Sequence, residues 1–110
     1  YNKFYVLGEN GNASNYPSNL TVGEPGRIIV GVSNHEHQSL TYRVNLILDG
    51  ESVNATTVTV EDDGTWEATF RFVPESTGKL KLRILLFKSD ESSLESEPYR
   101  ELRLWINVAG

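Results

Sequence analysis

The stretch Asn15–Glu36, NYPSNLTVGEPGRIIVGVSNHE, decides the fold of this 110-residue chain. Its second half predicts a strand over Arg27–Ser33, in which one face is formed by Ile28, Val30 and Val32. Pro25 cannot donate to a strand ladder, so it belongs before this strand or at an edge. The polar run from Asn34 to His37 then ends the pairing. Strand, breaker and polar end together indicate a β-sandwich and contain no catalytic motif.

Working outward, the same two-residue period recurs along the chain, and no window shows a helical period. Tyr1–Leu7 is predicted as the first strand, and Leu20 with Val22 as a short edge strand. Polar loops are expected over Gly8–Ser18 and Ser89–Pro98. Further strands, each with one apolar face, are predicted over Leu40–Leu48, Glu51–Val60, Thr65–Val73, Lys79–Phe87 and Tyr99–Val108.

Turn signals separate these strands. Asp49–Gly50 and Glu61–Gly64 have the residues that hairpin turns require. A change of phase along Glu51–Val60 predicts a bulge or a switch between sheets near Thr56. About seven strands at this spacing predict an all-β protein, an antiparallel immunoglobulin-like or fibronectin III-like sandwich. The chain has no cysteine, so we expect no disulfide.

Length and composition set limits on function. The 110 residues predict a single domain, 1–110, and the formal net charge of −5 argues against nucleic acid as a partner. No apolar run is long enough for a membrane span, and the start lacks the apolar region of a signal peptide. The chain begins at Tyr1 and has no methionine, so we expect a domain excised from a longer protein.

Several segments carry a family resemblance that spans nearly the whole chain. They are the opening stretch above together with KFYVLGENG at 3–11, DDGTWEATFRF at 62–72, LRILLF at 82–87 and YRELRLWINV at 99–108. The chain resembles a family of archaeal membrane proteins of unknown function and, more distantly, adhesion-related immunoglobulin-like domains of prokaryotic surface proteins. The resemblance implies an extracytoplasmic β-sandwich, anchored at the cell surface by membrane helices outside this sequence. It implies no known activity.

Three N-glycosylation sequons begin at Asn12, Asn19 and Asn54. The first two fall in the polar loop and at its exit. Asn54 has the parity opposite to Val53, so we expect it to face solvent. Surface exposure is what this modification needs, and all three are therefore candidates if the domain lies outside the cytoplasm.

Metal chemistry has weak support. His35 and His37 would share a face in an extended stretch, but two imidazoles fall short of a zinc ligand set. The run Glu61–Gly64, perhaps joined by Asp49 and Glu51, offers oxygen ligands, yet turn chemistry already accounts for these residues. We therefore expect no metal site and no cofactor.

Catalytic constellations are missing from the sequence. No cysteine nucleophile and no GxSxG or comparable serine, histidine and aspartate spacing is present. The abundant carboxylates are interpreted as a solvated surface, because a glycosidase also needs a cleft that a bare sandwich of this size hardly accommodates. We expect the protein not to be an enzyme.

The outward parity of the later strands gives the candidate binding surface. An apolar and aromatic stripe is predicted from Ile47, Leu85, Phe87, Tyr99 and Trp105. Arg43, Arg83 and Arg103 would edge it, with Arg103 counted among the binding residues. Exposed Trp, Tyr and Arg together resemble interface hot spots. The opposing interpretation is that the Tyr1–Leu7 strand or a register shift covers this stripe.

The sequence thus predicts a non-catalytic interaction or structural module. The expected partner is a protein or a second copy of the chain, bound through the stripe. The alternative is a carbohydrate-binding module in which Trp105 and Tyr99 stack on sugar rings, with Glu101, Arg103 and Asn107 orienting the hydroxyl groups. A passive spacer, with no binding function on this face, is the third possibility.

Overall fold

The computed structural model describes residues 2–8, 19–89 and 100–110, and in these residues it contains only strands, turns and loops. The strands are β1 Asn2–Leu7, β2 Asn19–Thr21, β3 Gly26–Asn34, β4 Leu40–Leu48, β5 Glu51–Val60, β6 Thr65–Phe72, β7 Gly78–Ser89 and β8 Arg100–Ala109. Two predicted loops lie almost wholly outside the described residues. They are Gly8–Ser18, of which only Gly8 is described, and Ser89–Pro98, of which only Ser89 is described. No helix capable of crossing a membrane occurs in the described part.

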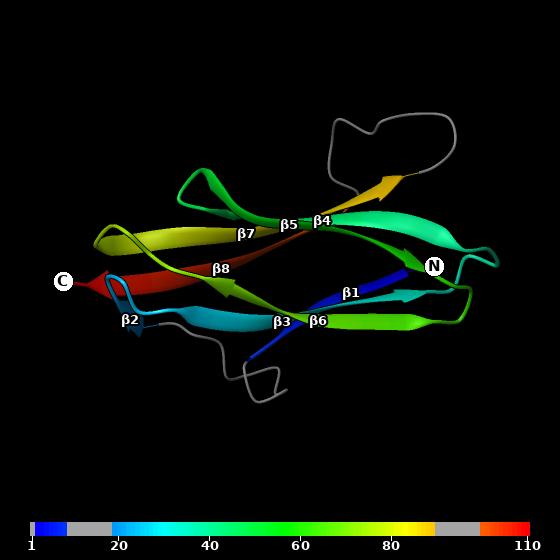
Figure 1. The fold of residues 1–110 in the computed structure, drawn as a ribbon, viewed down its shortest axis with the longest axis horizontal. Coiled ribbons are helices and arrows are strands. Elements are labelled where there is room, and N and C mark those ends of the chain that lie inside the picture. The colour runs from blue at the N-terminus through cyan, green and yellow to red at the C-terminus, as the bar shows by residue number, and fades with distance from the viewer. Residues whose placement is uncertain (1, 9–18, 90–99) are drawn as a thin grey trace.

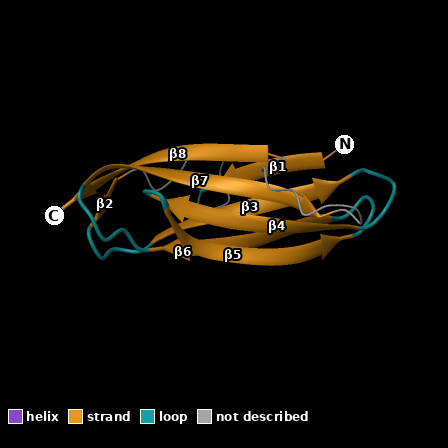
Figure 2. Cartoon of the chain, turned by 90° about the horizontal axis from the view of Figure 1, so that it is seen from above, coloured by secondary structure: helices purple, strands orange, loops and turns teal. Residues whose placement is uncertain are grey.

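Two sheets pack face to face (Figures 1 and 2). One has the strand order β1-β3-β6, and the other has the order β2-β8-β7-β4-β5. Every neighbouring pair is antiparallel except β2 and β8, which pair in parallel through Asn19–Thr21 and Asn107–Ala109. The predicted all-β sandwich is confirmed, and the short edge strand predicted around Leu20 is β2.

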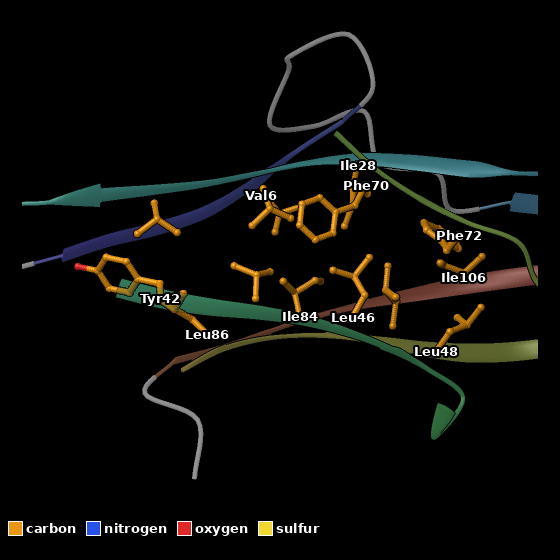
Figure 3. Close-up of a cluster of buried hydrophobic side chains, with 14 of the residues drawn as sticks. Val6, Ile28, Tyr42, Leu46, Leu48, Phe70, Phe72, Ile84, Leu86 and Ile106 are labelled. Carbon is orange, nitrogen blue, oxygen red and sulfur yellow. The ribbon is translucent and has the colours of Figure 1, made fainter. Parts of the chain in front are cut away.

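The core lies between the sheets, and both supply side chains to it in alternation (Figure 3). The alternating apolar residues of β4 and β7 are all buried, as predicted: Leu40, Tyr42, Val44, Leu46, Leu48, Leu80, Leu82, Ile84 and Leu86. Ile28, Val30, Val32, Phe70 and Phe72 close the core from the opposite sheet. Burial of each large side chain stabilises the fold by roughly 1.5–3 kcal/mol relative to exposure.

The two turns predicted as hairpins behave differently. Asp49 and Gly50 have φ angles of 52° and 87°, the left-handed values of a two-residue hairpin loop, and β4 pairs directly with β5. The hairpin prediction for Glu61–Gly64 is wrong, because β5 and β6 belong to different sheets. Gly64 N donates to Glu61 O at 2.8 Å, so the chain reverses tightly there but crosses to the other layer. β6 pairs instead with β3.

The predicted irregularity of β5 exists, but at another position. Leu46 pairs with Asn54 and Ile47 pairs with Ser52, so Val53 is the extra residue of a bulge. The expected site near Thr56 is therefore wrong by three residues. Because the bulge lies before Asn54, pairing is regular from there to Val60, and Asn54 shares the face of Val60, which is in the core, while Val53 is exposed.

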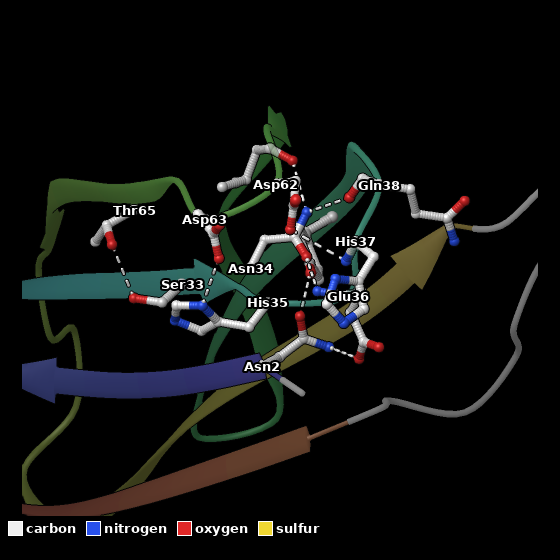
Figure 4. Close-up of polar contacts among 12 residues, drawn as sticks. Asn2, Ser33, Asn34, His35, Glu36, His37, Gln38, Asp62, Asp63 and Thr65 are labelled. Carbon is white, nitrogen blue, oxygen red and sulfur yellow. Dashed lines mark hydrogen bonds and ion pairs between the residues drawn. The ribbon is translucent and has the colours of Figure 1, made fainter.

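A buried asparagine joins several chain segments at one end of the sandwich (Figure 4). Asn34 is fully buried, and its amide nitrogen donates to Gln38 O at 2.7 Å and Val60 O at 2.8 Å. Its side-chain oxygen accepts from Glu36 N at 2.9 Å. Its backbone exchanges hydrogen bonds with the Glu61–Gly64 turn. The polar run that was predicted to end β3 thus fastens the inter-sheet turn.

The first strand is fixed beside this asparagine by a second polar chain. Tyr42 is fully buried and its hydroxyl donates to Asn2 Oδ1 at 2.5 Å. Asn2 in turn donates through Nδ2 to Glu36 Oε1 at 2.9 Å, which Lys88 approaches to 3.7 Å. These contacts hold the start of β1 at the sandwich end and satisfy the polar atoms that burial would otherwise penalise.

The outer face of the three-stranded sheet carries a close approach between neighbouring strands. Tyr5 lies opposite Gly31, and a Cβ atom at position 31 would overlap the Tyr5 ring. The Tyr5 hydroxyl donates to Glu67 Oε2 at 2.5 Å. Partial burial together with the bond and charge of Glu67 raises the pKa of Tyr5 to about 12. The Tyr5 side chain therefore crosses β3 to reach β6 and fixes β1 at the edge of the three-stranded sheet.

Candidate interaction surface

The candidate surface lies on β8, β7 and β4, on the side of the five-stranded sheet that points away from the core. We call this surface the outer face. Antiparallel pairing places outward residues of the three strands in rows across it. Arg43 lies opposite Phe87, and Asn45 lies opposite Leu85. The outward residues of the rows nearer the β2 end are Ile47, Arg83 and Arg103, then Lys81 and Trp105, then Lys79 and Asn107. β1 belongs to the other sheet, so it does not cover this face.

Trp105 is the most prominent side chain of the outer face, with 52% of its surface exposed. Lys79 Nζ lies 5.1 Å and Lys81 Nζ 5.8 Å from the centroid of its ring. Both distances are within the range of cation–π attraction. Neither lysine forms an ion pair among residues 2–8, 19–89 and 100–110. The exposed indole is therefore flanked by two ammonium groups without a carboxylate partner in that part of the chain.

Next to this group, one carboxylate binds two guanidinium groups. Arg83 Nη2 donates to Glu101 Oε1 at 2.8 Å, and Arg103 Nε donates to Glu101 Oε2. Hydrogen bonds from Arg83 and then Arg103 lower the pKa of Glu101 to about 2, although partial burial opposes the shift. The same contact raises the pKa of Arg83. Glu101 thus holds both arginines in place and offsets part of their charge.

The predicted continuous apolar stripe is not present. Leu85 is only 5% exposed, because it lies between Asn45 and Glu101 and is flanked along β7 by Arg83 and Phe87. Ile47 and Phe87 are half-buried. The guanidinium carbon of Arg43 lies over the Phe87 ring, 4.4 Å from its centroid. Tyr99 lies outside the described residues. Of the six predicted binding residues, Trp105 and Arg103 are exposed.

Charge distinguishes the outer face from the rest of the chain. Among the described residues, its outward side chains on β4, β7 and β8 include five cations and one carboxylate: Arg43, Lys79, Lys81, Arg83, Arg103 and Glu101. The whole chain has 10 Lys and Arg against 15 Asp and Glu. The alternation of Lys79, Lys81 and Arg83 already placed them outward, but the lysines were not included in the predicted site. Their contact with Trp105 required the β7–β8 register.

A shallow depression of about 530 Å³ adjoins the outer face where β2 meets β8. Lys79 and Asn107 of the outer face line it, together with Asn19, Thr21 and Glu24. Thr21 N donates to the Glu24 carboxylate at 2.9 Å, which orders the turn at this edge. Leu20, Val108 and Ala109 also line the depression, so its lining is mixed polar and apolar, and it lies two residues along β8 from Trp105.

The sequons have three different placements. Asn12 lies outside the described residues. Asn19 is exposed at the start of β2. Asn54 is half-buried opposite the fully buried Leu46, so the expectation that it faces solvent is wrong. The bulge at Val53 inverts the parity on which that expectation depended.

The histidines and acidic turns take part in local contacts. His35 Nδ1 lies 3.1 Å from Asp63 Oδ1, and His37 N donates to Asp62 Oδ1 at 3.1 Å. His37 has a φ of 66°, so this segment is a turn and not the extended stretch in which the two imidazoles would share a face. Asp49 and Glu51 lie at the opposite end of β5 from the Glu61–Gly64 turn. The described residues contain no cluster of three or more His, Cys, Asp or Glu suited to a metal ion.

Fold and surface together define an immunoglobulin-like β-sandwich module with one basic, tryptophan-bearing sheet face. The chain belongs to the DUF1616 family, a domain of unknown function, whose model matches residues 1–107. A search of curated proteins gives no match to the chain. The resemblance to a family of unknown function that was inferred from the sequence is thereby confirmed, and the family's description names no reaction.

Solved structures support the fold. The chain is similar to the CARDB domain of a Pyrococcus furiosus protein, seen in a crystal structure in complex with di-metal ions, with TM-score 0.71 and 14% identity. That match covers 99% of this chain and 94% of the other. A solution structure of the same domain gives the same score and identity over 99% and 96% of the two chains. A β-glucosidase from Listeria innocua is also similar, with TM-score 0.60 and 16% identity. That match covers 100% of this chain and only 16% of the β-glucosidase.

Proposed function

We propose that this domain is a non-catalytic interaction module that binds a protein partner through the outer face, centred on Trp105. The observation that carries the proposal is a half-exposed indole on a sheet face whose other large apolar residues are less exposed, with Leu85 buried and Ile47 and Phe87 half-buried. Tryptophan and arginine are enriched at interface hot spots, and Arg103 lies two residues from Trp105 on the same face of β8.

The proposal includes a location. The family resemblance read from the sequence favours an extracytoplasmic domain at the cell surface, anchored in the membrane through segments outside this sequence. An exposed Asn19 sequon at the start of β2 fits such a location, since glycosylation needs an accessible acceptor. Asn54 adds no support, because it lies half-buried on the inner face.

A carbohydrate ligand is the second candidate. The depression that Asn19, Lys79 and Asn107 line in part lies close to Trp105 along β8, and sugar sites combine an aromatic platform with a few polar groups. Tyr99, the second predicted platform, lies outside the described residues. Glu101 and Arg103 are already bonded to one another, which reduces the groups left to orient hydroxyls.

Site-specific photocrosslinking in the full-length protein tests the first candidate. A benzophenone amino acid at Asn107, beside Trp105 on the exposed face of β8, should form an adduct with one protein species in the native cells. Trp105→Ala in the same protein should abolish the adduct. The matched control carries the probe at Thr69, an exposed position on the outer side of β6, and should give no such species.

The partner identified by mass spectrometry is then purified and titrated against the domain and its Trp105→Ala variant. Identical adducts from both probe positions, or adducts that survive Trp105→Ala, would refute the proposal. A glycan array separates the second candidate, because a protein-binding face should leave it blank. If the domain gives a signal on the array and the Trp105→Ala variant does not, the ligand of this face is a sugar and not a protein.

A further inference from the structure

We infer that the outer face recognises an acidic segment of the partner, in extended conformation and with carboxylates at every second residue. This inference rests on the proposed function, because it gives the chemistry of the partner for the same surface. It is carried by three observations: the charge of the outer face, the lack of an ion pair at Lys79 and Lys81 within the described residues, and the spacing of cations along β7.

The first observation is that the outer face is positively charged, whereas the rest of the chain is negatively charged. The outer face carries five cations and one carboxylate among the described residues, which leaves five Lys and Arg against fourteen Asp and Glu for the remainder of the chain. An acidic segment is therefore attracted to the outer face and repelled elsewhere. Such a field orients an approaching partner and raises the rate of productive encounter.

The second observation concerns how the cations are held. Arg83 and Arg103 share Glu101, so part of their charge is offset. Lys79 and Lys81 form no ion pair in the part of the chain that the structure describes, and both lie over the Trp105 ring. A carboxylate that binds them breaks no existing salt bridge. The indole between them then packs against the aliphatic part of the bound segment.

The third observation is geometric. Lys79, Lys81 and Arg83 alternate along β7 on one face, so their backbone positions repeat at about 6.6 Å. An extended peptide presents every second side chain at that same spacing. Three carboxylates in the pattern Glu-x-Glu-x-Glu therefore match three successive cations in register. A compact phosphate or an isolated carboxylate uses only one of the three.

An anionic bilayer is the competing source of negative charge. It extends beyond the outer face and would also meet acidic residues at the same end of the sandwich, such as Glu24 near β2 and Asp49 after β4. A narrow peptide avoids them. The observations therefore favour a peptide, and vesicles form a separate arm of the test.

The test measures fluorescence anisotropy of labelled synthetic peptides titrated with the purified domain. The probe peptide has Glu at every second position with Ser between, and its isomer has the same residues with all Glu in one block. The alternating peptide should bind the more tightly of the two, and its Kd should rise strongly from about 0.05 M to about 0.5 M NaCl. Lys79→Gln with Lys81→Gln should raise Kd by about 10-fold or more.

Lys3→Gln with Arg71→Gln is the matched control, since it removes two exposed cations from the opposite sheet. It should change Kd less than about twofold. Equal weakening by the two double variants, equal binding of the two peptides, or no binding of either would overturn the inference. So would binding to vesicles of phosphatidylcholine and phosphatidylglycerol without binding to the alternating peptide.

The two proposals fail separately. If crosslinking from position 107 yields a Trp105-dependent protein partner while the alternating peptide does not bind, the protein-binding function stands and its acidic recognition element is wrong. If crosslinking yields no partner, the proposed function itself is wrong.

Discussion

Glu101 illustrates how a single side chain organises the outer face. Its side chain is 16% exposed, and its carboxylate bridges Arg83 on β7 and Arg103 on its own strand. The two arginines lie opposite each other in register, and like charges in that position repel. One carboxylate between them converts a repulsive pair into a bonded group. The arrangement gives the face a fixed guanidinium pair beside the more weakly held lysines.

This residue predicts a pH dependence of stability. The folded-state pKa of Glu101 is lowered from 4.5 to about 2, which means that folding stabilises the ionised carboxylate relative to the protonated carboxyl group. The stabilisation is present above pH 4.5 and is lost as the pH falls from about 4.5 to about 2. Glu101→Gln lacks this contribution. Urea unfolding of both proteins should show the difference in unfolding free energy shrinking across that window.

One outcome would contradict the predicted pH dependence. If the difference in unfolding free energy between wild type and Glu101→Gln stays constant from pH 6 to pH 2, the Arg83–Glu101–Arg103 contact contributes no pH-dependent stability.

At the scale of elements, the end of β3 shows how a polar residue holds a β-sandwich together. Asn34 donates to carbonyls of the segment before β4 and of β5, and it accepts from Glu36. Asp63 N donates to Asn34 O at 2.8 Å, so the inter-sheet turn depends on the same residue. The described part has no buried side-chain polar atom without a partner, and Asn34 supplies several of those bonds.

We predict that Asn34→Asp destabilises the fold by about 3 kcal/mol or more. The substitution replaces two amide donors with a carboxylate oxygen that faces the carbonyls of Gln38 and Val60. Urea unfolding at pH 7 measures the loss. Asn107→Asp, on the exposed side of β8, is the matched control and should change stability by less than about 0.5 kcal/mol. Equal effects at the two positions would show that the Asn34 amide contributes little.

The same elements show what sequence patterns predict and what they leave open. β4 and β5 begin and end where the alternation and the Asp49–Gly50 turn place them, because both signals are local. The Glu61–Gly64 turn was identified as a reversal, but its residues do not encode which strand β6 joins. Pairing of β3 with β6 spans the whole β4–β5 hairpin in sequence. Partner choice of that kind depends on burial of two sheets at once.

For the candidate surface, too, the sequence predicted some features and missed others. Parity placed Trp105 outward, and it is exposed. Parity alone also made Leu85 exposed, whereas its cross-strand neighbours Asn45 and Glu101 and its flanking long side chains bury it. Those neighbours follow from the register between strands distant in sequence. The lysine contacts of Trp105 follow from that register too.

At the scale of the whole molecule, the inner face of the five-stranded sheet belongs to the core, and its outer face is the proposed binding surface. Phe70 is buried in the shared core and packs edge-on against Trp66, with ring centroids 6.2 Å apart and an interplanar angle of 81°. Trp105, on the opposite side of the five-stranded sheet from this core, contacts lysines and solvent. Substitutions at the two aromatic residues should therefore have different consequences.

We predict that Phe70→Ala lowers the free energy of unfolding by about 3–5 kcal/mol, as for other buried aromatic truncations. Trp105→Ala should lower it by about 1 kcal/mol or less, because half of that side chain is already in water. Urea unfolding followed by far-UV circular dichroism measures both without depending on tryptophan signal. Similar losses for the two variants would mean that Trp105 belongs to the folded core and not to a binding face.

The bulge at Val53 has a further consequence for the protein in concentrated solution. β5 is an edge of the five-stranded sheet, and a long regular edge is a template on which another chain can add a strand. The extra residue twists β5 and breaks the even spacing of its outward N–H and C=O groups. The opposite edge ends in β2, which has only 3 residues. There β2 covers only Asn107–Ala109 of β8, so the irregular β5 border is the one of the two that is protected along its length against strand addition and fibrous aggregation.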